Sequence, residues 1–213
     1  MLCGRLELMK WLRQIVALVF PARYTRAQLK IIPRAPNPDI RNVFACFDYH
    51  HTKGKALVYA LKRTRDRILT QYVAEHMAEH VYEYLAEQQQ FSYFLNPIVV
   101  PVPITKRQRQ VRGFNQTEAL AREFAQLIGG SYTPYLAYKH RETEKQALVK
   151  SRSQRFINVQ NCFSLSREQQ SDLLHKDIII IDDLVTTGAT IASLEKTLRA
   201  AGARNVIAIT VAH

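Results

Sequence analysis

One stretch of the sequence limits the fold more than any other, because it joins a buried-type strand to an acidic turn and the start of a helix. Residues 178–190 read Ile-Ile-Ile-Ile-Asp-Asp-Leu-Val-Thr-Thr-Gly-Ala-Thr. Four consecutive isoleucines are typical of a strand that is covered on both faces, as the strands of parallel sheets are. The pattern therefore predicts a strand over residues 177–182, a turn, and a helix that runs to about Ala201.

The rest of the chain alternates strands and helices in the same way. Apolar runs and helical spacing predict strands over residues 43–47, 98–100, 135–139 and 205–211, and helices over residues 55–62, 65–89 and 115–128. Asn115 is the expected N-cap of the last helix, with Glu118 completing a capping box. This alternation predicts an α/β fold in which helices cover both faces of a mostly parallel sheet.

The charge of the chain indicates anionic partners. The sequence carries 30 Lys and Arg against 18 Asp and Glu, a net charge of +12. Such a charge favours polyanions, phosphate esters and acidic membrane surfaces as ligands. Residues 1–42 hold eight basic and two acidic side chains, and three prolines lie near their end. We therefore expect two parts, a short basic N-terminal extension over residues 1–42 and a domain over residues 43–213.

The cysteines and the apolar N-terminal run predict where the protein works. Cys3, Cys46 and Cys162 form no CxxC pair, so neither a disulfide framework nor a cysteine zinc site is expected. A reducing cytoplasm is the predicted location. The apolar run over residues 15–20 is far shorter than the roughly 18 residues that a membrane span needs. It predicts a helix that docks on the protein, or one that lies weakly on acidic lipid and makes the protein membrane-associated.

The predicted helix over residues 65–89 carries two polar patterns. The glutamates that recur every fourth residue are Glu75, Glu79, Glu83 and Glu87. A row of like charges on one side of a helix is typical of a solvated face. His76 and His80 are four residues apart, a spacing that can hold a metal, but no HExxH motif and no third ligand lies near them. We therefore expect a solvated acidic face and no metal site on this helix.

The acidic turn that follows the isoleucines is the strongest candidate for a binding site. Ligands of open α/β sheets bind at the carboxyl ends of the strands, and the N–H groups at a helix N-terminus bind phosphate. We expect Asp182 and Asp183 to accept hydrogen bonds from sugar hydroxyls, or to meet Mg²⁺ through water. The residues expected to hold the phosphate end are Val185, Thr186, Thr187, Gly188, Ala189 and Thr190.

A simpler interpretation of the same turn stays open. In it, residues 186–188 form only a strand-to-helix connection and Asp183 only caps the helix that follows. Two adjacent acids directly after a buried strand favour the binding site over this interpretation. The GxxxxGK[ST] motif of a P-loop and the GxGxxG motif of a dinucleotide fold are both absent. The predicted ligand is therefore a sugar phosphate.

The motifs of the chain resemble those of two known groups of proteins. The stretch 178–190 resembles the phosphoribosyl diphosphate motif of type I phosphoribosyltransferases. Residues 100–103, which read Val-Pro-Val-Pro, and residues 112–116, which read Arg-Gly-Phe-Asn-Gln, are similar to the more specific pattern of the ComF competence family. Weaker matches to that pattern lie at residues 47–49, 61–62, 143, 146–148, 155–158 and 202–203. The resemblance covers residues 43–213, about four fifths of the chain.

The resemblance implies a type I phosphoribosyltransferase fold and a cytoplasmic role in DNA uptake during natural transformation, without one settled reaction. It implies phosphoribosyl diphosphate or a related sugar phosphate as ligand, Mg²⁺ as the candidate cofactor, and Asp182 and Asp183 as the catalytic pair of any transferase reaction. Many members of the family carry an N-terminal double zinc ribbon. Residues 20–42 correspond to it here but hold none of its cysteines, so residues 1–42 are interpreted as a degenerate zinc-ribbon region that binds no zinc.

Two sets of basic residues complete the candidate sites. In the segment 104–113, which we expect to be a loop, Lys106, Arg109 and Arg112 would face the diphosphate. The residues expected to contact nucleic acid are Lys62, Arg63, Arg65, Arg112, Lys145, Lys150 and Arg155. A solvated basic surface is the alternative for both sets.

Three functions stay open at this point. The first is a DNA-uptake protein that binds a phosphoribosyl ligand and engages single-stranded DNA or other uptake proteins, such as a helicase. The second is a Mg²⁺-dependent phosphoribosyltransferase that acts on an unknown acceptor. The third is a sensor that binds phosphoribosyl diphosphate without turnover. A shared fold does not choose among them, because one fold can host many functions.

Overall fold

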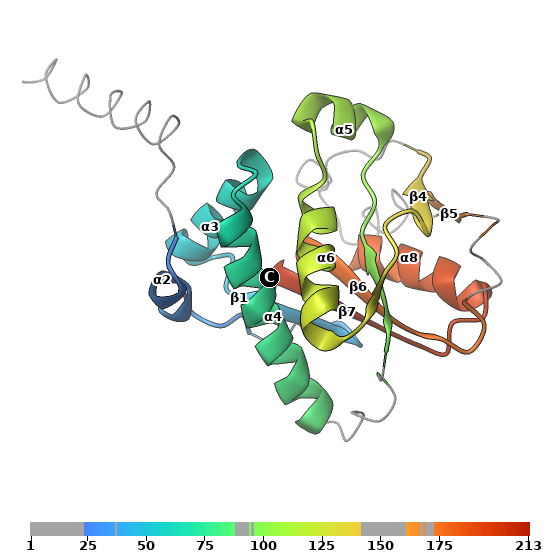
Figure 1. Ribbon diagram of the computed structural model, residues 1–213, viewed down its shortest axis with the longest axis horizontal. Helices are drawn as coiled ribbons and strands as arrows, with labels where there is room; N and C mark the ends of the chain where they lie inside the picture. The colour runs from blue at the N-terminus through green and yellow to red at the C-terminus, as the bar shows by residue number, and fades with distance from the viewer. Residues whose placement is uncertain are drawn as a thin grey trace, which may run out of the picture.

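A five-stranded parallel sheet forms the centre of the protein (Figure 1). The computed structural model describes residues 24–36, 38–87, 94, 96–141, 161–166, 168 and 173–213. The strands of the sheet are β1 (Val43–Phe47), β2 (Ile98–Pro101), β3 (Ser131–Tyr132), β6 (Asp177–Leu184) and β7 (Asn205–Ala212). Their order is β1-β7-β6-β2-β3, and every neighbouring pair runs parallel. The predicted α/β fold with a mostly parallel sheet is therefore confirmed.

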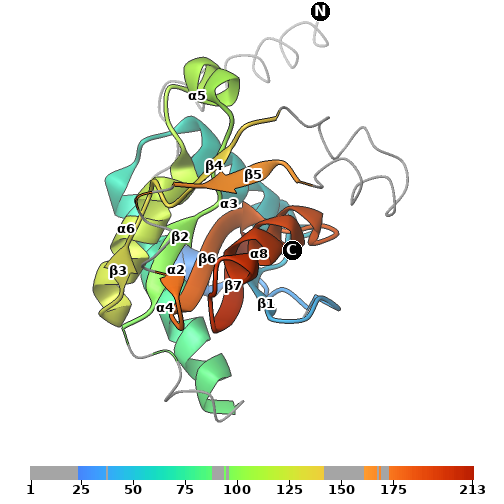
Figure 2. The ribbon, with the colours of Figure 1, turned by 90° about the vertical axis from the view of Figure 1, so that its right-hand side faces the viewer.

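Helices cover both faces of this sheet, also as predicted. The described helices are α2 (Arg26–Lys30), α3 (Thr52–Arg63), α4 (Arg67–Glu87), α5 (Lys106–Arg112), α6 (Gln116–Ile128) and α8 (Ala189–Ala200). Figures 1 and 2 show α4 and α6 on one face of the sheet and α8 on the other. The predicted strand over residues 135–139 is β4 (Ala137–Lys139), which pairs with β5 (Phe163–Leu165) in a separate antiparallel sheet.

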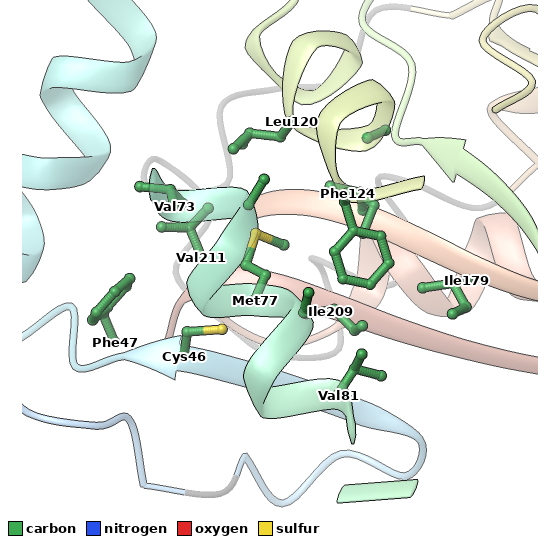
Figure 3. Close-up of a cluster of buried hydrophobic side chains, with 14 of the residues drawn as sticks. Cys46, Phe47, Val73, Met77, Val81, Leu120, Phe124, Ile179, Ile209 and Val211 are labelled. Atoms are coloured by element: carbon green, nitrogen blue, oxygen red, sulfur yellow. The ribbon is translucent and has the colours of Figure 1, made fainter. Parts of the chain in front are cut away.

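The isoleucines of β6 supply both hydrophobic cores, because successive side chains of a strand point to opposite faces. Ile179 and Ile181 belong to the cluster under α4 and α6, whereas Ile178 and Ile180 belong to the cluster under α8. Figure 3 shows the first cluster, in which α4, α6 and the sheet meet. Its labelled side chains are Cys46, Phe47, Val73, Met77, Val81, Leu120, Phe124, Ile179, Ile209 and Val211. A strand so fully covered explains the unbroken apolar run in the sequence.

The predicted loop over residues 104–113 is wrong, because most of it is helix α5. Thr105 caps its start, and the Thr105 and Gln108 side chains form a reciprocal capping box. Gly113, in the left-handed region at φ 76°, ends it. None of its residues is buried, so no apolar periodicity marks the helix in the sequence.

The start of α6 was predicted only in part. Asn115 is its N-cap as expected, with a side chain that accepts a hydrogen bond from the Thr117 backbone N–H. The predicted capping box with Glu118 is wrong, because the Glu118 carboxylate binds the Arg109 guanidinium of α5. This ion pair ties the exposed helix α5 to the first turn of α6.

Residues 24–36 and 38–42 pack against the sheet and α4. Leu29 and Ile32 are buried in the first hydrophobic cluster. The Ala35 N–H donates to the Cys46 carbonyl at 3.1 Å, and the Asp48 N–H donates to the Pro33 carbonyl at 2.9 Å. The division of the chain at residue 42 stays a prediction, and residues 1–23 lie outside the described part.

The acidic side of α4 is not simply solvated, contrary to expectation. The Glu75 carboxylate binds Arg26 at 2.7 Å, and the Glu83 carboxylate binds Arg34 at 3.1 Å. Arg26 also lies over the Tyr72 ring, 4.8 Å from its centroid. Two of the four glutamates therefore hold the segment that precedes β1, a contact between distant parts of the chain that helical spacing alone does not reveal.

The two histidines of α4 serve packing. The His76 ring stacks on Phe47 with centroids 4.6 Å apart, and burial, followed by the neighbouring His80, lowers the pKa of His76 to about 4. Among the described residues, no group of three or more His, Cys, Asp or Glu side chains could hold a metal ion. None of the described helices has the length and apolarity to span a membrane.

Gly54 sets how closely α3 approaches the turn after β1. A Cβ atom at this position would lie 2.0 Å from the Asp48 carbonyl oxygen, so Gly54→Ala must displace α3 or the turn. We expect a loss of about 1–3 kcal/mol in the free energy of unfolding, measured by urea titration. Lys55→Ala, at an exposed position of the same helix, should stay within about 0.5 kcal/mol of the parent protein. Equal stability of the two variants would contradict the close contact.

Candidate functional site

The acidic pair lies near the C-terminal end of β6, at the carboxyl edge of the sheet. β6 continues to Leu184, so the turn begins two residues later than predicted. Asp182 and Asp183 are therefore strand residues whose side chains leave opposite faces of the sheet. The alternative in which Asp183 caps the following helix is wrong, because the N-cap of α8 is Gly188.

Asp183 is a buried carboxylate held from two helices. Its side chain is 9% exposed. The Lys62 ammonium, at the end of α3, lies 3.1 Å from one of its oxygens. The Gln116 side-chain amide, in the first turn of α6, donates to the other oxygen. Both carboxylate oxygens thus have a partner within the protein, which joins α3, β6 and α6 at one point.

Asp182 occupies a different electrostatic environment from its neighbour. Burial and then the adjacent charge of Asp183 raise the pKa of Asp182 to about 7. The Asp183 backbone N–H, which donates to Asp182 at 2.8 Å, opposes this rise, as do the charges of Lys62 and Lys139. Asp182 therefore exchanges a proton near neutral pH, a property common among groups at functional sites.

The turn after β6 forms a small pocket over the start of α8. The residues that line it are Asp182, Leu184, Val185, Thr186, Gly188, Ala189, Thr190 and Ile191. Gly188, at φ 75°, gives α8 no side-chain cap. The first N–H groups of a helix have no partner within it and attract anions, so this end of α8 suits a phosphate group.

The predicted phosphate-binding residues occupy this turn with different exposures. Val185 is buried, and its N–H donates to the Ala212 carbonyl of β7 at 3.0 Å, so it anchors the turn. Thr186 is exposed, whereas Thr187 and Thr190 are half-buried. The Thr187 hydroxyl oxygen is buried and has no hydrogen-bond partner among the described residues.

Ile40 contacts the turn from the segment before β1. A Cβ atom at Gly188 would lie 2.9 Å from both Ile40 Cδ1 and Ile40 Cγ2. A side chain at residue 188 would thus be strained by its backbone conformation and by this contact. Sequence reasoning missed the contribution of Ile40, because nothing in the run of prolines around it indicates where the segment packs.

The basic residues expected to face a diphosphate lie on α5. Lys106, Arg109 and Arg112 are all exposed, and Arg109 is paired with Glu118. Their contact with a diphosphate stays a prediction. Arg65 contacts the turn that follows this helix, since its guanidinium donates to the Gly113 carbonyl at 2.6 Å and lies over the Phe114 ring. The turn between α3 and α4 therefore touches the turn between α5 and α6.

The residues expected to contact nucleic acid fall into three groups. Arg63, Arg65 and Arg112 are exposed near the carboxyl edge of the sheet. Lys62 lies at the same edge, but its ammonium is paired with Asp183. The remaining three, Lys145, Lys150 and Arg155, lie outside the described residues.

The side chain of Gln116 is a functional candidate for which the sequence predicted no role, although Gln116 belongs to the motif over residues 112–116. Its position offered a signal, because it follows an N-cap at the start of a helix that comes after a strand. Such a residue lies at the carboxyl edge of a parallel sheet, where ligands bind.

Curated proteins similar to this chain are competence and DNA-utilisation proteins. The chain is 33% identical over 108 residues to the DNA utilization protein YhgH of Salmonella typhi, which covers 51% of this chain and 45% of that protein. It is 33% identical over 107 residues to the competence protein ComFC of Streptococcus pneumoniae, covering 50% and 44%. The competence protein F of Haemophilus influenzae is 26% identical over 110 residues, covering 51% and 46%.

The predicted resemblance to the ComF competence family is confirmed by these relatives, in the half of the chain that they match. The chain spans slightly less than half the length of each of them. No protein-family model matches the chain.

Solved structures similar to this protein include two proteins whose names refer to phosphoribosyl compounds. A glutamine phosphoribosylpyrophosphate amidotransferase from B. subtilis shares 20% identity at a TM-score of 0.36, over 62% of this chain and 26% of that one. A hypoxanthine phosphoribosyltransferase from Staphylococcus aureus shares 13% identity at a TM-score of 0.34, over 66% and 62%. These scores are low, and the fold assignment depends on the strand order and register described above.

Neutralising each aspartate should have opposite effects on stability. The raised pKa of Asp182 means that the folded protein binds more protons than the unfolded chain between pH 4 and 7, so this residue lowers stability as the pH rises through about 7. Asp182→Asn should therefore raise the free energy of unfolding by about 1–2 kcal/mol at pH 8 and by much less at pH 4. Urea unfolding at the two pH values measures the difference.

Asp183→Asn is the matched control, with the same loss of one charge at the next residue. It places an amide donor against Lys62 or Gln116, so we expect a loss of about 1–3 kcal/mol at pH 8. Destabilisation by both variants to the same extent would contradict the different environments of the two carboxyl groups.

Proposed function

Because this chain is similar to the DNA utilization protein YhgH and to the competence proteins F and ComFC, we propose that it is a DNA-utilisation protein with a sugar-phosphate site at the carboxyl edge of its sheet. The observation that carries the sugar-phosphate site is the pairing of two acids with the uncapped N-terminus of α8. The N–H groups of α8 and the turn before it attract the phosphate, and the acids accept hydrogen bonds from the sugar. Phosphoribosyl diphosphate is the proposed ligand.

Mg²⁺ is the proposed companion of the diphosphate, held through water at the acidic pair. Both oxygens of Asp183 already have partners, so direct coordination there would displace Lys62 or Gln116. Asp182, which has one backbone partner, is the better position for a hydrated ion. The ion would supply positive charge to the diphosphate oxygens.

The exposed cations around the site support an interaction with DNA. Arg63, Lys106, Arg107 and Arg112 are exposed on the ends of α3 and on α5. The Arg65 contact to Gly113 keeps these two regions next to each other. Cations grouped in this way bind the phosphate backbone of single-stranded DNA without reading its sequence. DNA-uptake proteins, including a helicase, are the proposed protein partners.

A phosphoribosyltransferase is the second candidate function, and one observation favours it. Asp182 has a pKa of about 7, which suits a residue that exchanges protons during a reaction near neutral pH. Asp182 and Asp183 would be the catalytic residues of this enzyme. Release of diphosphate in the presence of nucleobases would support it, and binding without release would favour a sensor of phosphoribosyl diphosphate.

The phosphate end of the site can be tested at Gly188. Gly188→Ala should weaken binding of phosphoribosyl diphosphate with Mg²⁺ by about 10-fold or more, measured by calorimetry, because the new Cβ strains the turn and meets Ile40. Gly129→Ala is the control, since Gly129 also has a positive φ of 70° but nothing within 4 Å of the added atom. An equal effect of both variants, or of neither, would count against a phosphate at this turn.

The proposed DNA surface can be tested by reversing charges that have no role in holding the acidic pair. Arg63→Glu with Arg112→Glu should weaken single-stranded DNA binding and reduce the slope of log affinity against log salt by about 0.7 per lost contact. Lys176→Glu makes the same change directly before β6, at the opposite edge of the sheet, and should have little effect. Fluorescence anisotropy at several salt concentrations measures both. An unchanged slope in the double variant would remove this surface from the proposal.

A further inference from the structure

The Gln116 side chain has one hydrogen-bonding atom left over at the acidic pair. Gln116 is 4% exposed, and its amide nitrogen donates to Asp183. Its amide oxygen is buried and has no hydrogen-bond partner among the described residues. A buried acceptor without a donor is costly, so native proteins rarely keep one without a reason.

The orientation of this amide is fixed by charge. Asp183 is paired with the Lys62 ammonium at 3.1 Å, and an ionised carboxylate can only accept hydrogen bonds. The amide nitrogen must therefore face Asp183, since the opposite orientation would place two acceptor oxygens together. The amide oxygen is left to accept a hydrogen bond from elsewhere.

We propose that the Gln116 amide oxygen accepts a hydrogen bond from a hydroxyl group of the sugar when a sugar phosphate binds. Lys62 acts as a positioning residue, because its ammonium pairs with the Asp183 carboxylate and leaves that carboxylate to accept the amide N–H, so the amide keeps the orientation that presents its oxygen. This inference rests on the proposed sugar-phosphate site. Gln116 is then the residue that distinguishes a sugar phosphate from a bare phosphate, which needs only the turn before α8.

The hydrogen-bonding groups of Gln116, Asp183 and Lys62 support a hydroxyl as the group that is recognised. A hydroxyl both donates and accepts, so it can donate to the Gln116 oxygen and accept from a neighbouring donor. A phosphate monoester, with a second pKa of about 6, is mostly a dianion near neutral pH, so its oxygens would meet the Gln116 oxygen as further acceptors. The neighbouring carboxylate of Asp183 would repel it as well.

The experiment compares ribose 5-phosphate with inorganic phosphate by calorimetry. Gln116→Met keeps the length of the side chain and removes both hydrogen-bonding groups. We expect this variant to bind ribose 5-phosphate on the order of 10-fold more weakly than the parent protein and to bind inorganic phosphate equally well. An equal loss for both ligands, or a loss for neither, would overturn the role of Gln116 while the proposed function stands. If the parent protein bound neither ligand, the proposed function itself would fall, and the inference with it.

A second variant keeps the test valid if Gln116→Met does not fold. Gln116→Glu, when protonated, can donate to Asp183 and still accept from the sugar, but when ionised it opposes Asp183. Its affinity for ribose 5-phosphate should therefore fall more steeply from pH 5 to pH 8 than that of the parent protein. The same pH dependence in both proteins would overturn the proposal.

Lys62 provides an independent check on the positioning step. Lys62→Arg keeps a cation next to Asp183, whereas Lys62→Met removes it. We expect Lys62→Met to lose discrimination between ribose 5-phosphate and inorganic phosphate, and Lys62→Arg to restore most of it. Retained discrimination in Lys62→Met would show that the amide needs no ion pair to hold its orientation.

Discussion

The contact of Asp183 with Lys62 and Gln116 joins the three elements that surround the candidate site. α3 brings the ammonium, α6 brings the amide and β6 brings the carboxylate, so none of these elements can shift without breaking a buried polar contact. A buried ion pair of this kind contributes little net stability, because desolvation offsets much of the attraction. Its main effect here is geometric, since it selects one arrangement of two helices over the end of a strand.

The negative charge of the two adjacent acids is reduced in two different ways. Asp183 has its negative charge balanced by Lys62, while the raised pKa of Asp182 leaves that group partly neutral near pH 7. The edge of the sheet therefore repels an anion much less than two free carboxylates would. This explains how an acidic pair and an anion-attracting helix N-terminus can lie next to each other.

Continuous apolar patterns made most of the fold predictable. The strands at residues 43–47 and 177–182 and the helix capped by Asn115 were expected because burial leaves a local signature in the sequence. Helix α5 was missed because it buries nothing and depends on its caps. The partner of Lys62 was missed as well, since a lysine in a basic run gives no local sign of a carboxylate more than a hundred residues away. The spacing of residues along the sequence does not reveal site geometry that depends on such tertiary contacts.

The position of β7 has a consequence for how the protein is made. β7 (Asn205–Ala212) comes later in the chain than all of its sheet partners, yet it lies between β1 and β6. A growing chain emerging from the ribosome would hold β1 and β6 with unpaired, apolar edges until residues 205–212 arrive. Pairing over such a distance is slow to form. The sheet is therefore completed only when β7 pairs with both β1 and β6, so the order of synthesis leaves the closing of the sheet to a late step.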